Sequence, residues 1–110
     1  MELTEETADF CTILLIEGRL DTATYGALDA KLAEMLAAGK SKILVDCSKL
    51  DYVSSSGLRV FLTGLKKVTA AKGKFVLCGL QESIQEIFEI SGFNGIFEIF
   101  PGREQARGAF

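Results

Sequence analysis

The sequence of 110 residues contains no histidine and only one proline. Histidine provides the general base of Ser-His and Cys-His catalysis and is a common zinc ligand, so its absence removes those mechanisms and phosphohistidine chemistry as well. The two common glycine-rich phosphate-binding patterns, G-x-x-x-x-G-K-[ST] and G-x-G-x-x-G, are also absent. We therefore expect that the protein is not an enzyme and holds no cofactor or metal ion.

Cysteine is scarce and is not arranged as in redox or zinc motifs. The three cysteines, Cys11, Cys47 and Cys78, are an odd number and show no Cys-x-x-Cys spacing. Each lies within or at the end of an apolar run, which is typical of a small core residue. We interpret all three as core residues.

Long apolar runs and an excess of positive charge are missing too. The longest clear apolar run, Ile13–Ile16, has the length of a strand, whereas a membrane span needs roughly 18 residues. The formal net charge is −3, and nucleic-acid-binding domains usually carry a basic footprint. The first six residues lack the basic and apolar regions of a signal peptide. We expect a cytoplasmic monomer that neither spans a membrane nor binds nucleic acid directly.

The apolar residues that are present predict an alternation of strands and helices. The predicted strands cover residues 10–17, 42–47, 75–78 and 96–100, with a weak edge strand within 1–9. The predicted helices cover residues 25–36, the segment from the serines at 54–56 to just before 73, and 82–91. Residues 18–22 are predicted as a turn, 48–53 as a connection, and the tail 102–110 as one helical turn near 104–107 or a flexible end.

This order favours an α/β fold in a single domain over residues 1–110. We expect a mixed, mostly parallel sheet of four to five strands with three to four helices, joined by right-handed crossovers. On the first helix the apolar residues that recur at steps of three and four are Tyr25, Leu28, Leu32, Met35 and Leu36, which predicts an inward face. On the second helix the predicted inward face consists of Leu58, Phe61, Leu62, Leu65 and Val68.

The stretch Val53–Leu58 places three consecutive serines and a glycine between a predicted strand and a predicted helix. A helix N-terminus has unpaired N–H groups and a partial positive charge, which suit a capping hydroxyl and also an attached phosphate. One serine is enough for a cap, and its replacement by alanine costs about 1 kcal/mol. Since binding surfaces in parallel sheets lie beyond the C-terminal ends of strands, we expect the serines at that edge. A helix cap and a phosphoacceptor both remain open.

Charged residues offer weaker candidates. Asp21, Asp46 and Asp51 lie near predicted strand ends or loops, where paired acids could perform acid–base or magnesium chemistry. No acidic motif links them, so we favour Asp21 as a helix cap, with Thr22 and Thr24 as further plausible caps, and Asp46 as the end of a strand. A modest basic group surrounds the second helix: Arg59, Lys66, Lys67, Lys72 and Lys74. We interpret it as a solvated face that could also meet an acidic partner surface.

The segment Val45–Leu58 resembles the central signature of STAS domains, the family of bacterial anti-sigma factor antagonists. In that signature an apolar strand and an Asp-containing turn lead to Asp-Ser-Ser/Thr-Gly-Leu at a helix start. Glu17–Asp21 and Ile87–Phe93 resemble two further segments of the family, so the likeness covers essentially residues 10–100 in order and spacing. Three matching segments are specific for the domain and less specific for its role.

The resemblance implies a partner-switching regulator of transcription. In the family, the unphosphorylated domain binds an ATP-dependent anti-sigma factor serine kinase, which then releases its sigma factor, and a PP2C-type phosphatase reverses the phosphorylation. Carried onto this chain, the phosphoacceptor is Ser55, with Ser56 and Ser54 as alternates. The partner-binding residues that we expect are Asp21, Ser54, Ser55, Ser56, Gly57 and Arg59.

The chain departs from the family pattern at Ser54, where an aspartate is usual. This departure motivates an alternative, a non-switching STAS adaptor that docks on a transporter ATPase or a signalling scaffold. A phosphate on Ser55 would add roughly −1.5 to −2 charges at a helix start, which tolerates negative charge. We therefore expect that phosphorylation leaves the fold intact and disrupts a partner interface.

Overall fold

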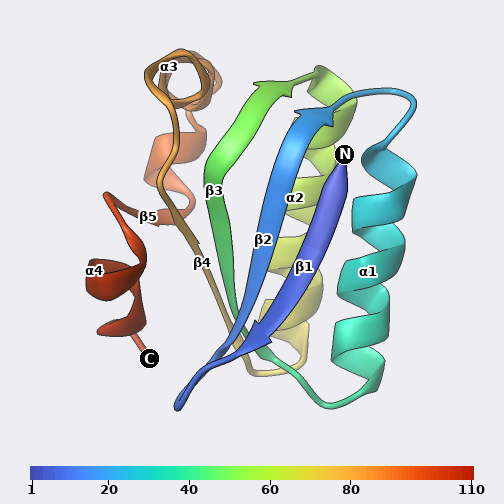
Figure 1. Ribbon diagram of the computed structural model, residues 1–110, viewed down its shortest axis with the longest axis vertical. Coiled ribbons are helices and arrows are strands. Elements are labelled where there is room, and N and C mark those ends of the chain that lie inside the picture. The colour runs from blue at the N-terminus through green and yellow to red at the C-terminus, as the bar shows by residue number, and fades with distance from the viewer.

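The five strands of the sheet lie side by side in the order in which they occur in the chain (Figure 1). The computed structural model describes all 110 residues. Its strands are β1 (Glu2–Thr7), β2 (Thr12–Leu20), β3 (Lys42–Val53), β4 (Lys74–Cys78) and β5 (Glu98–Phe100). Its α-helices are α1 (Tyr25–Ala37), α2 (Ser55–Ala70), α3 (Glu82–Ile90) and α4 (Arg103–Arg107), with a short 3-10 helix at Phe93–Gly95. The predicted α/β class, the strand number and the helix number are confirmed.

The sheet is parallel except at its N-terminal edge. β1 pairs antiparallel with β2, and β2, β3, β4 and β5 pair in parallel, each with the next. β1 is polar and contributes Leu3 to the core from its inward side. The weak edge strand predicted within residues 1–9 is therefore present.

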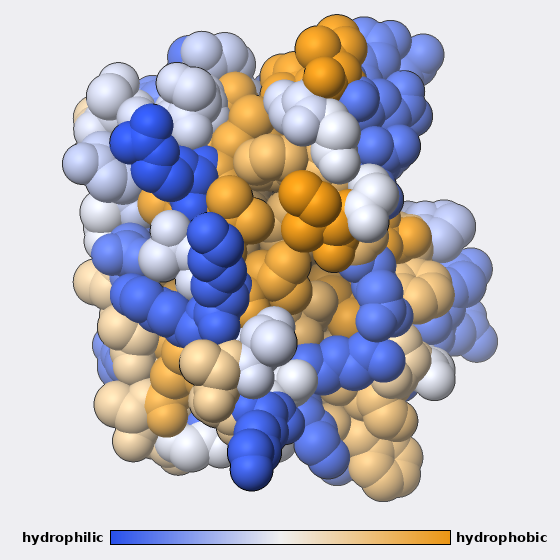
Figure 2. Space-filling view, turned by 180° about the vertical axis from the view of Figure 1, so that it is seen from behind, coloured by the Kyte–Doolittle hydropathy of each residue, from blue (hydrophilic) through white to orange (hydrophobic).

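The two faces of the sheet carry different cores because successive side chains of a strand point to opposite faces. Ile43 and Val45 of β3 belong to the main core with residues of α1, α2 and α3, while Leu44 belongs to a smaller cluster that includes Ala106 of α4. Figure 1 shows α2 passing behind the strands. Figure 2 shows that helical face from behind, with apolar surface gathered along its middle and upper part. None of the helices has the length and hydropathy that a membrane crossing requires.

All three cysteines are buried and free, which confirms their interpretation as core residues. Cys47 belongs to the main core, and Cys11 and Cys78 lie in the smaller cluster near α4. Burial raises the pKa of Cys78 to about 11 and that of Cys47 well above its ordinary value. The thiols therefore stay protonated at neutral pH and are poor nucleophiles.

Strands β2 and β3 are longer than the apolar pattern predicts. Residues 18–20 continue β2 and residues 48–53 continue β3, so the predicted turn at 18–22 and the predicted connection at 48–53 are largely wrong. The parallel pairing of the two strands continues across two register shifts, one between Leu15 and Glu17 and one between Gly18 and Arg19. Gly18 has a φ of 99°, a conformation that glycine adopts without strain. Such irregularities break the alternation of apolar and polar residues, which hides the strand from a period-based prediction.

The inward face of α2 is centred on its glycines rather than on its leucines. Its buried residues are Gly57, Val60, Phe61, Gly64 and Val68. Phe61 and Val68 confirm the predicted face, whereas the three predicted leucines, Leu58, Leu62 and Leu65, are only half-buried. A Cβ at Gly64 would lie 2.9 Å from Cδ1 of Leu32, so α1 and α2 pack more closely than larger residues would allow. Hydropathy scales assign glycine little weight and therefore miss this contact.

Candidate functional site

The serine stretch lies at the C-terminal edge of the parallel strands, as predicted. β3 ends at Val53, which pairs with Leu20 at the end of β2, and α2 begins at Ser55. The amide of Ser54 donates to the carbonyl oxygen of Leu20 at 2.9 Å. This bond joins the start of α2 to the chain that leads into Asp21, so the two predicted partner-binding segments are neighbours in the fold.

The structure assigns different positions to the three serines. Ser54 is the N-cap of α2, in extended conformation, and its hydroxyl oxygen accepts a hydrogen bond from the amide of Gly57 at 3.2 Å. Ser55 is the first residue of the helix and is exposed, whereas Ser56 is half-buried. Because Ser54 provides the cap, the hydroxyl of Ser55 is not needed for it.

Asp21 organises the loop before α1 and does not cap that helix. Its carboxylate accepts a hydrogen bond from the amide of Ala23 at 3.0 Å, and Thr24 is the N-cap residue of α1. The Thr24 hydroxyl accepts from the Asp21 amide at 2.9 Å and donates to the carbonyl oxygen of Arg19 at 2.8 Å. The Ala23 amide lowers the pKa of Asp21, so this carboxylate stays ionised at the site's edge. The prediction that Asp21 caps the helix is therefore wrong, because its carboxylate closes a turn and the alternative candidate Thr24 occupies the N-cap position.

A cleft of about 180 Å³ lies between α1 and α2 beside the serines. Its lining residues are Tyr25 and Asp29 of α1 and Ser56, Arg59, Val60 and Thr63 of α2. Arg59 is exposed, and the neighbouring Tyr25 is 42% exposed, although the helix pattern suggested that Tyr25 faces the core. The structure thus brings the predicted residues Ser56 and Arg59 into one concave surface.

Sequence reasoning missed the two tyrosines, which are the only ones in the chain. Tyr25 lines the cleft, and Tyr52 lies one residue before the end of β3 with the guanidinium of Arg19 4.1 Å from its ring centroid. Tyrosine and arginine are enriched in protein–protein interfaces. The available signal was their position in the sequence: Tyr52 lies within the family-like segment Val45–Leu58, and Tyr25 follows the segment Glu17–Asp21 by four residues.

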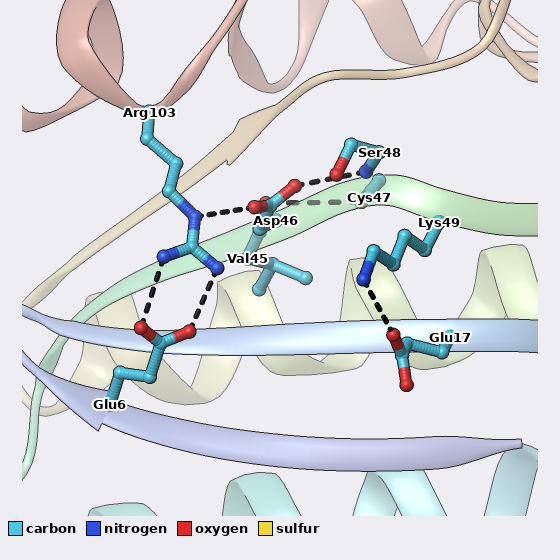
Figure 3. A network of polar contacts seen from close by, with 8 residues as sticks. All are labelled: Glu6, Glu17, Val45, Asp46, Cys47, Ser48, Lys49 and Arg103. Atoms are coloured by element: carbon cyan, nitrogen blue, oxygen red, sulfur yellow. Dashed lines mark hydrogen bonds and ion pairs between the residues drawn. The ribbon is translucent and has the colours of Figure 1, made fainter.

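Asp46 belongs to a separate polar network on the opposite face of the sheet from α1 and α2. It lies within β3 rather than at its end, and its side chain is 7% exposed. Figure 3 shows the guanidinium of Arg103 between Asp46 and Glu6, which come from β3 and β1. The two oxygens of Glu6 accept from Arg103 at 2.8 and 3.1 Å, and one oxygen of Asp46 accepts from the Ser48 amide at 2.9 Å. This network attaches α4 to the sheet.

The structure brings together no group of three or more acidic or cysteine side chains that could hold a metal ion. Asp46 is neutralised by Arg103, and Asp21 and Asp51 do not join it in any group that could hold a metal ion. The prediction that Asp46 ends a strand is wrong, because β3 continues for seven residues to Val53. The preference for a structural role of Asp46 over a catalytic one agrees with the ion pair.

We expect that Arg103→Met lowers the free energy of unfolding at pH 7 by about 2 kcal/mol, because it leaves a buried carboxylate without its cation. This loss is smaller than that expected for a fully buried ion pair, because the side chain of Arg103 is 34% exposed and solvent screens its charge. Arg107→Met is the matched control, because Arg107 lies on the same helix, is exposed and forms no ion pair. Urea unfolding of both variants measures the difference, and equal losses would contradict a role for the Asp46 pair.

The same network predicts a pH dependence. Burial by itself raises the pKa of Asp46, but hydrogen bonds from the Ser48 amide and the Arg103 guanidinium outweigh it and hold the pKa below its ordinary value. A carboxylate with a lowered pKa stabilises the fold fully above its unfolded pKa of about 3.9, and that stability is lost as the pH falls through the folded pKa. The cost of Arg103→Met should therefore shrink when the unfolding experiment is repeated near pH 3.

Comparison of the sequence and the structure with known proteins identifies a family and proteins with the same fold. The family model described as STAS domain matches residues 3–106. BtrV of Bordetella bronchiseptica, which is named as an anti-sigma factor antagonist, is 39% identical over 110 residues, covering 100% of this chain and 95% of BtrV.

Two solved structures have the same fold. A protein from Thermotoga maritima that is named as an anti-sigma factor antagonist superposes with a TM-score of 0.92 at 20% identity, covering 97% of this chain and 92% of the other. SpoIIAA of Bacillus in its phosphorylated form superposes with a TM-score of 0.76 at 20% identity, covering 98% of both chains. At this identity the two structures establish the common fold.

Proposed function

This chain belongs to the STAS domain family, and from that premise we propose that it is an anti-sigma factor antagonist that acts by binding rather than by catalysis. The similarity to BtrV, which extends over the whole chain, supports the role. The observation that carries the proposal is the exposed hydroxyl of Ser55 at the start of α2, beside a cap that Ser54 provides. A cytoplasmic location fits a protein of this role.

In the proposed switch, the unphosphorylated chain binds an anti-sigma factor serine kinase, and the kinase releases its sigma factor. The kinase then transfers the γ-phosphoryl group of ATP to Oγ of Ser55. The new O–P bond forms as the bond to the β-phosphate oxygen breaks, ADP leaves, and the hydroxyl proton passes to a base. A PP2C-type phosphatase adds water to this phosphoester, which restores the hydroxyl and releases inorganic phosphate.

The position of Ser55 suits a switch that alters binding without refolding the domain. The N-terminal end of α2 tolerates a phosphate because of its partial positive charge, and the cap on Gly57 comes from Ser54 and survives. An interface that covers Ser55 would have to bury a hydrated group of roughly −1.5 to −2 charges, which is strongly unfavourable. Phosphorylation therefore abolishes binding while the fold persists.

Ser54 keeps the structural contribution that the family's usual aspartate makes at this position. Serine and aspartate are both good N-cap residues, and the hydroxyl of Ser54 caps α2 through Gly57. The exchange removes one negative charge next to the acceptor and leaves the helix start intact. This supports Ser55 as the acceptor in spite of the departure from the family pattern.

We expect that Ser55→Ala binds the anti-sigma kinase as the wild type does, whereas Ser55→Asp binds at least about tenfold more weakly, because a desolvated charge costs several times RT. The measurement is titration calorimetry against each purified histidine-kinase-like anti-sigma protein of the same cell. Ser83→Asp is the matched control, since it adds the same charge to an exposed serine in the first turn of another helix, α3. Equal affinities of Ser55→Ala and Ser55→Asp would refute the switch.

The missing aspartate before Ser55 also favours a second candidate, a non-switching adaptor subunit of a transporter ATPase or a signalling scaffold. Intact-mass analysis of the protein from cells separates the two candidates. A mass increase of one phosphate that disappears in Ser55→Ala supports the switch. An unmodified mass under all growth conditions, together with association with an ATPase or scaffold, supports the adaptor.

A further inference from the structure

Arg59 is an exposed cation without a partner, four residues after Ser55 on α2. Two other basic residues of this region are engaged: Arg19 pairs with Asp21 and lies over Tyr52, and Lys67, in the last turn of α2, pairs with Asp29 at 3.8 Å. Arg59 takes part in no ion pair of the chain. Its charge is therefore available to a new anion.

The surroundings of Arg59 keep it available in the unmodified protein. It lines the cleft between α1 and α2 together with Tyr25, and the only carboxylic residue in the lining is Asp29. Asp29 pairs with Lys67 and forms no ion pair with Arg59. The cleft thus presents an aromatic ring and an unpaired arginine on the same edge as the serines.

The spacing of Ser55 and Arg59 suits a direct contact once the serine carries a phosphate. Residues four apart on a helix have Cβ atoms about 5–6 Å from each other, well within the reach of an arginine. A guanidinium binds phosphate through two parallel hydrogen bonds, which are about twice as strong as those between neutral groups.

We propose that Arg59 pairs with the phosphate on Ser55 and thereby leaves the cleft that it shares with Tyr25. The inference rests on the proposed function only in taking Ser55 as the acceptor. Phosphorylation then changes two surfaces at once: the helix start gains an anion, and the cleft loses its cation. An acidic side chain of the partner kinase that binds Arg59 in the unmodified complex loses that contact in the phosphorylated one.

The test places phosphoserine at position 55 during synthesis by amber suppression, so it needs no kinase. Phosphorus NMR then follows the second ionisation of the phosphate with pH in the otherwise wild-type protein, in Arg59→Gln and in Lys66→Gln. Since a nearby cation favours the dianion, we expect the phosphate pKa to be at least about 0.5 higher in Arg59→Gln than in the wild-type background.

Lys66→Gln is the matched control, because it removes the same charge from an exposed residue of α2 that forms no ion pair. Position 66 lies eleven residues from Ser55, which is roughly 16 Å along the helix and beyond the Debye length of about 8 Å at physiological salt. We expect the phosphate pKa in Lys66→Gln to equal that in the wild-type background. The phosphate pKa in Arg59→Lys should lie between those in the wild-type background and in Arg59→Gln. Identical titration of the wild-type background and Arg59→Gln overturns the proposal while leaving the kinase switch itself unaffected.

Discussion

Replacing Phe88 with alanine is expected to lower the free energy of unfolding by about 4 kcal/mol, the largest loss that we predict for a single substitution in this chain. Phe88 of α3 is fully buried. Its ring lies 5.8 Å from those of Phe61 and Phe97 and 6.1 Å from that of Phe93, measured between centroids. Removal of the ring leaves a cavity and ends all three aromatic contacts.

Urea unfolding measures this loss, with Ile90→Ala as the control on the same helix. Ile90 is 88% exposed, so its truncation should change stability by no more than about 0.5 kcal/mol. A similar loss in both variants would mean that α3 does not dock through Phe88. The prediction also concerns the candidate site, because Phe61 belongs to α2 and its ring packs against that of Phe88 in α3.

Replacing Gly57 with valine is expected to cost about 3 kcal/mol, because the added atoms overpack a filled space. A Cβ at Gly57 would lie 2.8 Å from Cγ of Leu20, 2.9 Å from its carbonyl oxygen and 2.9 Å from Cγ2 of Val53. The carbonyl oxygen belongs to the backbone and accepts the hydrogen bond from Ser54, so it cannot move without shifting the start of α2. Helix propensity alone predicts the opposite sign, since valine is a better helix former than glycine.

Gly26→Val tests that reasoning in the same protein. Gly26 also lies in the first turn of a helix, α1, but nothing lies within 4 Å of where its Cβ would be. Propensity then acts without steric opposition, and we expect a change between zero and a gain of about 0.5 kcal/mol. Thermal and urea unfolding compare the two variants. Equal effects at both glycines would show that the contact at Gly57 relaxes and that propensity governs both positions.

The sequence predicts those features of the candidate site that depend on the order of neighbouring residues along the chain. Three serines between an apolar run and a periodic helix place them at a helix start, and the alternation of strands and helices places that start at the C-terminal edge of the sheet. The sequence could not tell which serine is the cap. That depends on the backbone conformation at Ser54 and on the direction of the Gly57 amide, which exist only in the folded chain.

Contacts between distant residues were out of reach for a different reason. Arg103 lies 57 residues from Asp46 and 97 from Glu6, and no spacing rule connects residues so far apart. The same holds for the cleft, because Tyr25 and Arg59 meet only after α1 and α2 pack side by side. For Tyr25 the helical period predicted burial, but the residue is 42% exposed. The period shows which residues share a face of one helix and does not show how far the neighbouring helix covers that face.

The sequence by itself determined the class of the fold, the alternation of its elements, the buried cysteines and the place of the serines at a helix start, because these follow from local hydropathy, turn chemistry and family likeness. Only the tertiary structure decided the full length of β2 and β3, the role of Gly57 as a contact point, the pairing of Asp46 with Arg103 and the unpaired state of Arg59 beside Tyr25. These properties depend on which surfaces come together when the chain folds, and that information is spread over the whole sequence.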